Sequence, residues 1–400
     1  MRHKYFLFFI TTCFIFTGCS KREGLNTEIY NIDFEQGFDT EQQMFISEIA
    51  DSVEYIELKT PDGVVVTKIW DVKQFDDYLV IRAQNELFLF HKNGEFIRKV
   101  SALGQGSGEY SALCDVEFDL KKKELLILDV DKLLFYNLEG EFLRSKKNEY
   151  YTFQISISDS ILWMGETILT SDSKYSAVAT SLQGKGDTIA YIPNFLYGII
   201  DDDKWGIGPA AHIRFFYHEK DYLYFNGDLS NDTVWRISGV SAEPYAFIDM
   251  GKYKMPVEFE IWYSSREKFM QNISTYWGVS SMVESDRYFF LFSHKRDYNW
   301  REYKKDDEKF LKRVVYDKET KKTFSVKDKN GMGFSDDILG GPPIWPRFAS
   351  YDYYINYIET QELLEMVEDG EYLPSPPLKE LLSRIDDYSN DLIILIHRKK

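Results

Sequence analysis

Cysteine is nearly absent from this chain, which contains only Cys13, Cys19 and Cys114 among its 400 residues. The first two lie in a segment with the features of an export signal, so the folded part keeps a single thiol. A structural zinc site of the Cys/His type is thereby excluded, because such sites need several ligands at fixed spacing. Without a disulfide, an exported domain of this size must be held together by its own core.

Long apolar runs and positive charge are also scarce. After residue 18, no stretch is apolar and uncharged for the roughly 20 residues that a membrane-spanning helix needs. The 65 acidic residues outnumber the 48 lysines and arginines, which gives a net charge of -17. Such a surface repels nucleic acid, so no nucleic-acid partner is expected. By contrast, the 30 Phe, 28 Tyr and 8 Trp residues indicate a folded chain rich in strand-forming residues.

The N-terminus has the pattern of a secretory signal. Basic residues at positions 2–4 precede an apolar run over 5–16, and small residues follow it. The end of this segment, FTGC (16–19), resembles the lipobox of bacterial lipoproteins, in which the cysteine becomes the lipidated first residue. The resemblance implies a membrane anchor at Cys19 and, because Ser20 is not an inner-membrane retention residue, a place in the outer membrane. The alternative is an ordinary signal peptide with an accidental cysteine.

The strongest signal in the sequence is an internal repeat. Residues 79–98 (LVIRAQNELFLFHKNGEFIR) align without a gap on residues 125–144 (LLILDVDKLLFYNLEGEFLR), at an offset of 46. Each unit has a short apolar strand, a polar turn, a second strand, an x-Gly-Glu turn and a third strand. Gly94 and Gly140 occupy a turn position that favours positive φ. About 46 residues of this kind make one four-stranded propeller blade.

Helical signals are few and late in the chain. Apolar residues at spacings of three and four predict helices over 255–273, 360–370 and 376–387, which interrupt the strand rhythm as insertions. The last segment, 391–400, is again a strand. We predict that it shares the ring-closing blade with VEYIEL (53–58), because closure of the ring removes exposed strand edges.

These features predict an all-β fold, namely a six-bladed β-propeller with four-stranded antiparallel blades, a few helical insertions and ring closure by N- and C-terminal strands. Seven blades is the alternative, because the chain after residue 50 is long enough for more than six units before the insertions are subtracted. The domain organisation is then a lipoprotein signal peptide at 1–18, a flexible tether at 19–45 and the propeller at 46–400.

Cys19 and five short segments carry a family resemblance. The segments are KNGEF (92–96), LGQGSGEYSALCDVEFD (103–119), LEGEF (138–142), NDTVWRI (231–237) and NDLIILIHRK (390–399). Together they resemble the six-bladed β-propeller lipoproteins of Bacteroidota, relatives of NHL-type propellers. Ser107 departs from the family pattern, which often has proline at that place. The resemblance implies a fold and a place in the cell envelope, but no reaction, because members mostly lack an assigned activity.

The Gly-rich segment LGQGSGEY (103–110) raises the question of a phosphate-binding loop. A P-loop needs a lysine after its last glycine, and a dinucleotide loop must lead into a helix whose N-terminus binds the anion. This segment has no lysine and leads into an alternating strand pattern, so we interpret it as a connection between blades. Glu109 and Tyr110 are candidate ligand-binding residues at the rim, since binding residues favour loops on rigid scaffolds.

Two further pairs are candidates for ligand binding. His212 and Arg214 share one face of a predicted strand and would project toward the central opening, unless that face is simply exposed to solvent. Trp345 and Arg347 lie in the proline-bounded loop GGPPIWPRF, where an exposed indole could stack on a sugar ring or a peptide side chain. The alternative for this loop is a buried blade contact. The acidic run at 201–203 lacks the ligand spacing of a calcium site, so we interpret it as a solvated loop.

The sequence therefore predicts an exported, lipid-anchored binding or scaffold module for a peptide, a glycan or an envelope protein. It would bind through shape and stacking on loops, without catalysis. The alternative is an envelope hydrolase or lyase with its site in the central funnel, but no catalytic Ser/His/Asp set or carboxylate pair can be recognised among 65 acidic residues. No cofactor and no metal are expected, and the sequence does not indicate which side of the outer membrane the protein faces.

Overall fold

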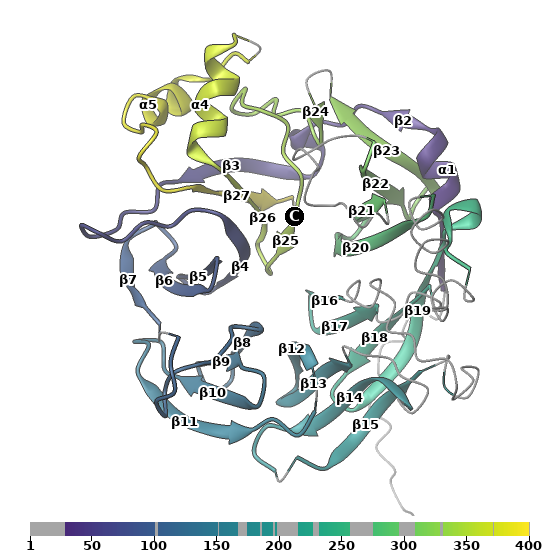
Figure 1. Ribbon diagram of the computed structural model, residues 1–400. Coiled ribbons are helices and arrows are strands. Elements are labelled where there is room, and N and C mark those ends of the chain that lie inside the picture. Colours follow the sequence, from purple (N-terminus) through teal and green to yellow (C-terminus); the bar gives the residue numbers. More distant parts are fainter. Residues whose placement is uncertain are drawn as a thin grey trace, which may run out of the picture.

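The computed structural model is a ring of six β-sheets, the blades, which lie around a common axis (Figure 1). It describes residues 29–100, 103–150, 152–166, 174–184, 186–194, 197, 215–226, 232–256, 275–295, 309–328, 331–370 and 372–399. The predicted six-bladed propeller is confirmed, and the alternative of seven blades is wrong.

The first strand of each blade lies nearest the axis, and the later strands follow outward (Figure 1). Blade I comprises β4 (Ile69–Phe75), β5 (Tyr78–Ala83), β6 (Glu86–His91) and β7 (Phe96–Lys99). Blade II comprises β8 (Asp115–Asp119), β9 (Glu124–Leu128), β10 (Lys132–Tyr136) and β11 (Phe142–Lys147). Blade III comprises β12 (Thr152–Ser158), β13 (Ile161–Glu166), β14 (Tyr175–Ser181) and β15 (Thr188–Pro193).

The remaining three blades include segments from both ends of the described chain. Blade IV comprises β16 (Phe215–Glu219), β17 (Tyr222–Asn226), β18 (Thr233–Ser238), β19 (Ser241–Asp249) and β1 (Tyr30–Asp33). Blade V comprises β20 (Trp277–Glu284), β21 (Tyr288–Lys295), β22 (Leu311–Asp317), β23 (Lys322–Asp328), β2 (Glu41–Gln42) and the short β24 (Gly331–Met332). Blade VI comprises β25 (Phe348–Ala349), β26 (Tyr353–Ile358), β27 (Leu392–Arg398) and β3 (Ala50–Ile56).

The ring is closed in blade VI by strands from opposite ends of the sequence. Strand β27 lies between β26 and β3 and pairs antiparallel with both, so that Ile394 faces Tyr55 and Ile396 faces Val53. The predicted pairing of the two terminal segments is confirmed. Because β27 is a central strand of its sheet, its five apolar residues 392–396 are almost completely buried.

The predicted flexible tether is wrong for its second half. Strand β1 adds to the outer edge of blade IV in parallel with β19, and β2 adds to blade V in parallel with β23. Helix α1 (Phe34–Asp39) joins them and packs on β22 and β23. Ile32 and Phe34 are completely buried. These apolar residues are too few and too widely separated by polar ones to predict a strand, so only the neighbouring edges define the segment. Residues 19–28 lie outside the described part of the chain.

The repeated turns have the conformation that the sequence predicts. Gly94 and Gly140 have φ of 86° and 73°, in the left-handed region that other residues adopt at a cost. At Gly94 a Cβ atom would also lie 2.1 Å from the backbone oxygen of Glu57, in the strand end that precedes blade I. The glycine of the x-Gly-Glu turn therefore allows the outer part of one blade to approach the preceding one.

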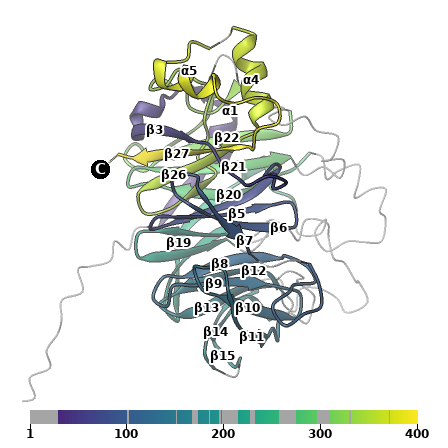
Figure 2. The same cartoon turned by 90° about the vertical axis from the view of Figure 1, so that its left-hand side faces the viewer.

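Two of the predicted helices are present and lie at the outer edge of blade VI (Figures 1 and 2). They are α4 (Thr360–Glu368) and α5 (Pro376–Leu382), both in the connection from β26 to β27. Leu363 and Leu381 face the core between blades V and VI. The predicted helix at 255–273 lies almost wholly outside the described residues. Among the helices that the structure describes, none has both the length and the apolar character that a bilayer crossing requires.

Candidate functional site

The segment LGQGSGEY connects the last strand of blade I to the first strand of blade II, as the sequence predicts. Gly106 N donates to Glu109 Oε2 at 2.7 Å, so the glutamate closes the loop on itself. Tyr110 is completely buried and donates to the carbonyl oxygen of Asn85 at 2.9 Å. Its pKa is raised to about 12, mainly by burial. Tyr110 thus packs in the core between the two blades and presents no surface to a ligand.

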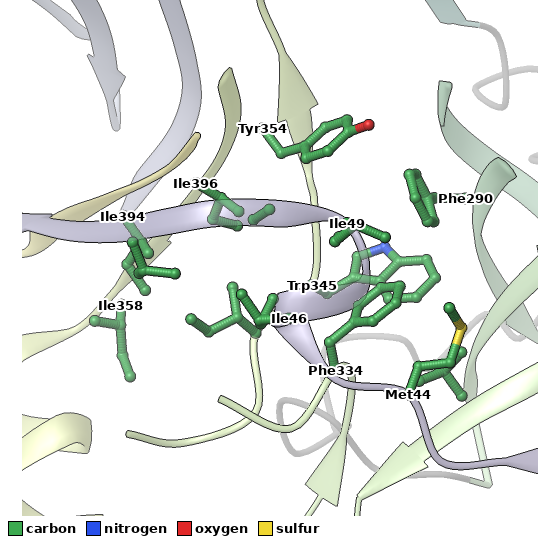
Figure 3. Close-up of a cluster of buried hydrophobic side chains, with 14 of the residues drawn as sticks. Met44, Ile46, Ile49, Phe290, Phe334, Trp345, Tyr354, Ile358, Ile394 and Ile396 are labelled. Carbon is green, nitrogen blue, oxygen red and sulfur yellow. The ribbon is translucent and has the colours of Figure 1, made fainter. Parts of the chain in front are cut away.

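Trp345 is also a core residue, with 1% of its surface exposed. Its ring stacks on Phe334, with centroids 5.6 Å apart and an interplanar angle of 22°, and Phe290 meets it edge-on (Figure 3). The blade contact that the sequence left as the alternative is therefore what the structure shows. Arg347 is partly buried and donates to the hydroxyl of Tyr357 at 3.1 Å.

The other predicted site residues lie outside the described part of the chain. They are Cys19, His212 and Arg214; the acidic run at 201–203, interpreted as a solvated loop, also lies outside it. Among the six proposed ligand-binding residues, the structure describes four: Glu109 and Tyr110 belong to the blade I–II loop, Trp345 to the blade V–VI core, and Arg347 to the connection that enters blade VI. The structure does not bring them together into one site.

A cluster of polar side chains that the sequence did not single out lies on the first strands of blades I to IV. Its members, called the axial cluster here, are Asp71 and Lys73 on β4, Asp115 and Glu117 on β8, Ser156 on β12 and His218 on β16. On β4 and β8, the residues between the charged pairs are Val72 and Val116, which are buried in the core. Alternation along a strand therefore sends both charged residues of each pair to the same face.

Glu117 is the centre of the axial cluster. Its Oε2 accepts a hydrogen bond from Lys73 Nζ at 3.2 Å and one from the Ser156 hydroxyl at 2.8 Å. Its Oε1 accepts from the backbone N–H of Phe118 at 2.9 Å. Ser156 Oγ also lies 2.8 Å from His218 Nε2. One chain of hydrogen bonds thus links four successive blades at the axis.

The carboxyl groups of the cluster have pKa values shifted in opposite directions. Burial alone would raise the pKa of Glu117, but Lys73, with a smaller contribution from His218, holds it below its ordinary value. Asp115 has no such direct ion pair, and burial raises its pKa to about 6, with a further contribution from Asp71. Burial also raises the pKa of Asp71.

His218 is held in the neutral form by its surroundings. Burial lowers the pKa of its imidazole, Lys73 lowers it further, and the opposing effect of Glu117 is smaller than the sum of these. The side chain nevertheless leaves 45% of its surface uncovered. His218 is therefore a solvent-accessible group on the innermost strand of its blade.

Not every member of the cluster can contact a ligand. Lys73 keeps 30% of its side chain exposed and Asp71 is partly exposed, whereas Ser156 is 99% covered. Trp70, the neighbour of Asp71, is the extra residue of a β-bulge in β4 and is more than half exposed. Bulges commonly re-aim side chains beside functional sites. The guanidinium of Arg82 lies 5.2 Å from the centroid of this indole.

A nucleophilic triad contains the same residue types as the set of Ser156, His218 and Glu117. The hydrogen bonds of this set, however, run in a different order. In such a triad the serine proton passes to histidine, and the carboxylate holds the other ring nitrogen. Here the carboxylate accepts the serine proton directly, and Ser156 is buried. The geometry therefore excludes Ser156 as a nucleophile. Within the described residues, no three His, Cys, Asp or Glu side chains are arranged to hold a metal ion.

A second polar network, called the Arg398 network here, lies near the axis between blades IV, V and VI. Arg398 Nη2 donates to Glu219 Oε1 at 2.7 Å and to the carbonyl oxygen of Glu284 at 3.2 Å. The two carboxylate oxygens of Glu284 accept from Tyr217, Tyr245 and Lys318. These side chains are almost fully covered, so the network is a structural connection rather than a surface for a ligand.

A signal for the axial cluster is present in the sequence, just before the repeat units. The segments DVK (71–73) and DVE (115–117) share Asp-Val and a charged third residue. Their offset is 44 rather than 46, so a gapless alignment of the repeat does not include them. An alignment with a two-residue gap would have placed both pairs on first strands of adjacent blades.

The family model described as a domain of unknown function (DUF4934) matches residues 29–397. The chain belongs to this family. The match begins at the first described residue and includes β1 and β2, in agreement with the place of both strands in the ring. No curated protein matches the sequence.

The comparison with solved structures gives one likeness over almost the whole chain and several weaker ones. A "putative exported protein" from Bacteroides fragilis has a TM-score of 0.69 and 20% identity, over 93% of this chain and 100% of that chain. Hydrazine synthase from Kuenenia stuttgartiensis (TM-score 0.37, 12% identity, 82% and 84% covered) and BamB from Moraxella catarrhalis (0.35, 10%, 69% and 66%) are more distant. The likeness to the Bacteroides fragilis protein confirms the expected propeller fold.

Proposed function

We propose that this protein is an exported, lipid-anchored binding protein of the outer membrane, which holds a short peptide at the axial cluster. The observation that carries the proposal is the exposure of His218 at one end of the hydrogen-bond chain, together with the partial exposure of Asp71 and Lys73 on the innermost strand of blade I. Polar groups of different chemistry that converge on one accessible place are typical of a small-ligand site. The export signal and the description of the Bacteroides fragilis relative support a place in the cell envelope.

The charges of the accessible groups favour a peptide over a glycan. Lys73 supplies a cation for a carboxylate, and the carboxyl group of Asp71 supplies an acceptor for an ammonium group. Each of these groups complements one end of a peptide with free termini, whereas a neutral sugar needs neither charge. Trp70, three positions before Lys73, adds an exposed aromatic surface on which a side chain of the ligand can pack.

A second candidate function, a lyase with an acid–base site at the same place, is favoured by one observation. The pKa of Asp115 is raised to about 6 by burial, while His218 is held neutral. Proton transfer requires a carboxylic acid that stays protonated into this range and an unprotonated base, and the axial cluster contains both groups. Mass spectrometry of peptides after incubation distinguishes the two functions, because a binding protein returns them unchanged.

The peptide proposal predicts selective retention of free termini. The full chain in detergent, incubated with a randomised tripeptide library, should retain peptides with free ends about tenfold or more over N-acetylated or C-amidated libraries, since a charged hydrogen bond contributes about 1.5–3 kcal/mol. Asp71→Asn should remove the preference for a free amine, and Lys73→Met the preference for a free carboxylate. Lys121→Met, at an exposed lysine outside the cluster, is the control.

The outcomes that contradict this proposal are specific. If the protein retains neutral oligosaccharides instead of peptides, and substitution of His218 weakens that retention, the ligand is a glycan. If the two axial variants bind as wild type does while their melting temperatures are unchanged, the site lies elsewhere on the ring.

The lipid anchor predicts incorporation of fatty acid at Cys19. Cells given a labelled fatty acid should label the wild-type protein, and Cys19→Ala should abolish the label and release the protein from the membrane fraction. Cys13→Ala, in the same segment, is the matched control and should keep the label. Equal labelling of Cys19→Ala and wild type would contradict the anchor.

A further inference from the structure

Ser156 has a single hydroxyl proton and two hydrogen-bond partners at 2.8 Å, Glu117 Oε2 and His218 Nε2. A hydroxyl can donate to only one of them and must accept from the other. The direction of the proton on Ser156 therefore decides the protonation state of the nitrogen on His218 that faces it.

Glu117 fixes that direction. Lys73 Nζ and the N–H of Phe118 donate to its two oxygens, and both interactions favour the ionised carboxylate. An ionised carboxylate can only accept, so the Ser156 proton points to Glu117. If the proton pointed to His218, two lone-pair-bearing oxygens would face each other at 2.8 Å. His218 must then donate from Nε2 to Ser156 Oγ.

We propose that His218 is the ligand-facing hydrogen-bond acceptor of the axial cluster, held as the Nε2–H tautomer by the hydrogen-bond chain through Ser156 and Glu117 to Lys73. The free lone pair is on Nδ1, and no described residue donates to that atom. The ring is nearly half uncovered, so a ligand can reach it.

The inference adds a requirement to the chemistry of the ligand. An acceptor at Nδ1 recognises a group that carries a proton, namely an ammonium, an amide N–H or a hydroxyl. The amino end of a peptide carries such a group. This part rests on the proposed function, whereas the tautomer of His218 does not.

The tautomer can be measured without a ligand. In the full chain labelled with ¹⁵N-histidine, the imidazole resonances of His218, assigned by their loss in His218→Gln, should show a protonated Nε2 and an unprotonated Nδ1 at neutral pH. Ser156→Ala should shift the population toward the other tautomer. Ser158→Ala is the matched control, because this serine is buried two residues along β12 and bonds the N–H of Gly239 instead. A protonated Nδ1 in the wild type, or no effect of Ser156→Ala, would overturn the inference.

Two substitutions of His218 separate the roles of its nitrogens in binding. The amide of asparagine reaches the place of Nδ1, and that of glutamine reaches the place of Nε2. His218→Asn should therefore keep retention of the free-terminus tripeptide library within about threefold of wild type, while His218→Gln should lose about tenfold, since one hydrogen bond to a charged group is missing. Equal loss in both variants would overturn the ligand-facing role. Failure of wild type to retain any tripeptide would overturn the proposed function, while the NMR measurement decides the tautomer separately.

Discussion

Deletion of residues 391–400 is expected to abolish the cooperative unfolding transition of the protein. The deletion removes β27, the central strand of blade VI, and leaves β26 and β3 without their shared partner. The lost residues include a run of five apolar side chains that are almost fully buried between two neighbouring cores. An open ring also exposes strand edges, which promote aggregation. Circular dichroism during heating, together with the soluble yield, measures the effect.

Deletion of residues 20–33 is the matched control. It removes a somewhat longer segment that includes β1, a fifth strand added to the outer edge of a blade that is already complete. This variant should melt at a lower temperature, because the core loses the buried side chain of Ile32, but the transition should stay cooperative. If the melting transition is unchanged after loss of residues 391–400, β27 is not the strand that completes the fold by closing the ring.

The blades could be predicted from the sequence because their signals are local. The strand pattern of residues 79–98 recurs at 125–144, and each x-Gly-Glu turn needs a left-handed glycine irrespective of the rest of the molecule. Closure could be predicted for a related reason. Two unpaired strand patterns remained at the ends, and a ring needs one more blade.

The edges occupied by β1 and β2 could not be predicted, because their pairing depends on neighbours that are distant in sequence. Tyr30 pairs with Ala246, and Gln42 pairs with Val326. A two-residue strand has no periodicity of its own, and its hydrogen bonds exist only when the outer edge of blade V is already formed. From the sequence alone, such segments cannot be distinguished from a polar linker.

The axial cluster could be predicted only in part, since the two Asp-Val pairs recur in the sequence but the ring brings the whole cluster together. Lys73, Glu117 and Ser156 belong to three blades, and each has an ordinary identity for a strand at a sheet edge. Only the arrangement of first strands around one axis places them within hydrogen-bond distance. Trp345 shows the opposite case, a residue for which the sequence suggests a ligand contact and the fold gives a core position. A tryptophan in a proline-bounded loop looks available to a ligand, but the connection from blade V to blade VI folds it into the core.

Replacement of Arg398 by methionine is expected to lower the free energy of unfolding by about 3–5 kcal/mol, which is typical when a buried ion pair loses one partner. Arg398 extends from blade VI to Glu219 on blade IV and to the backbone of blade V, and the Glu219 side chain is only 6% exposed. Methionine keeps much of the packing of the arginine stem but leaves this carboxylate buried without a cation. Urea unfolding of the full chain measures the loss.

Lys121→Met is the control, because it breaks an exposed ion pair between blades instead of a buried one. Lys121 pairs with Asp159 between blades II and III at 3.3 Å, but both side chains are more than half exposed, so its loss should cost no more than about 1 kcal/mol. The double variant Arg398→Met with Glu219→Gln tests the cause. If the cost of Arg398→Met comes from the unpaired charge, removal of that charge should restore part of the stability, because the two substitutions act on one interaction. A double variant that is no more stable than Arg398→Met would assign the loss to the hydrogen bonds with the carbonyl oxygens of Ser350 and Glu284 instead.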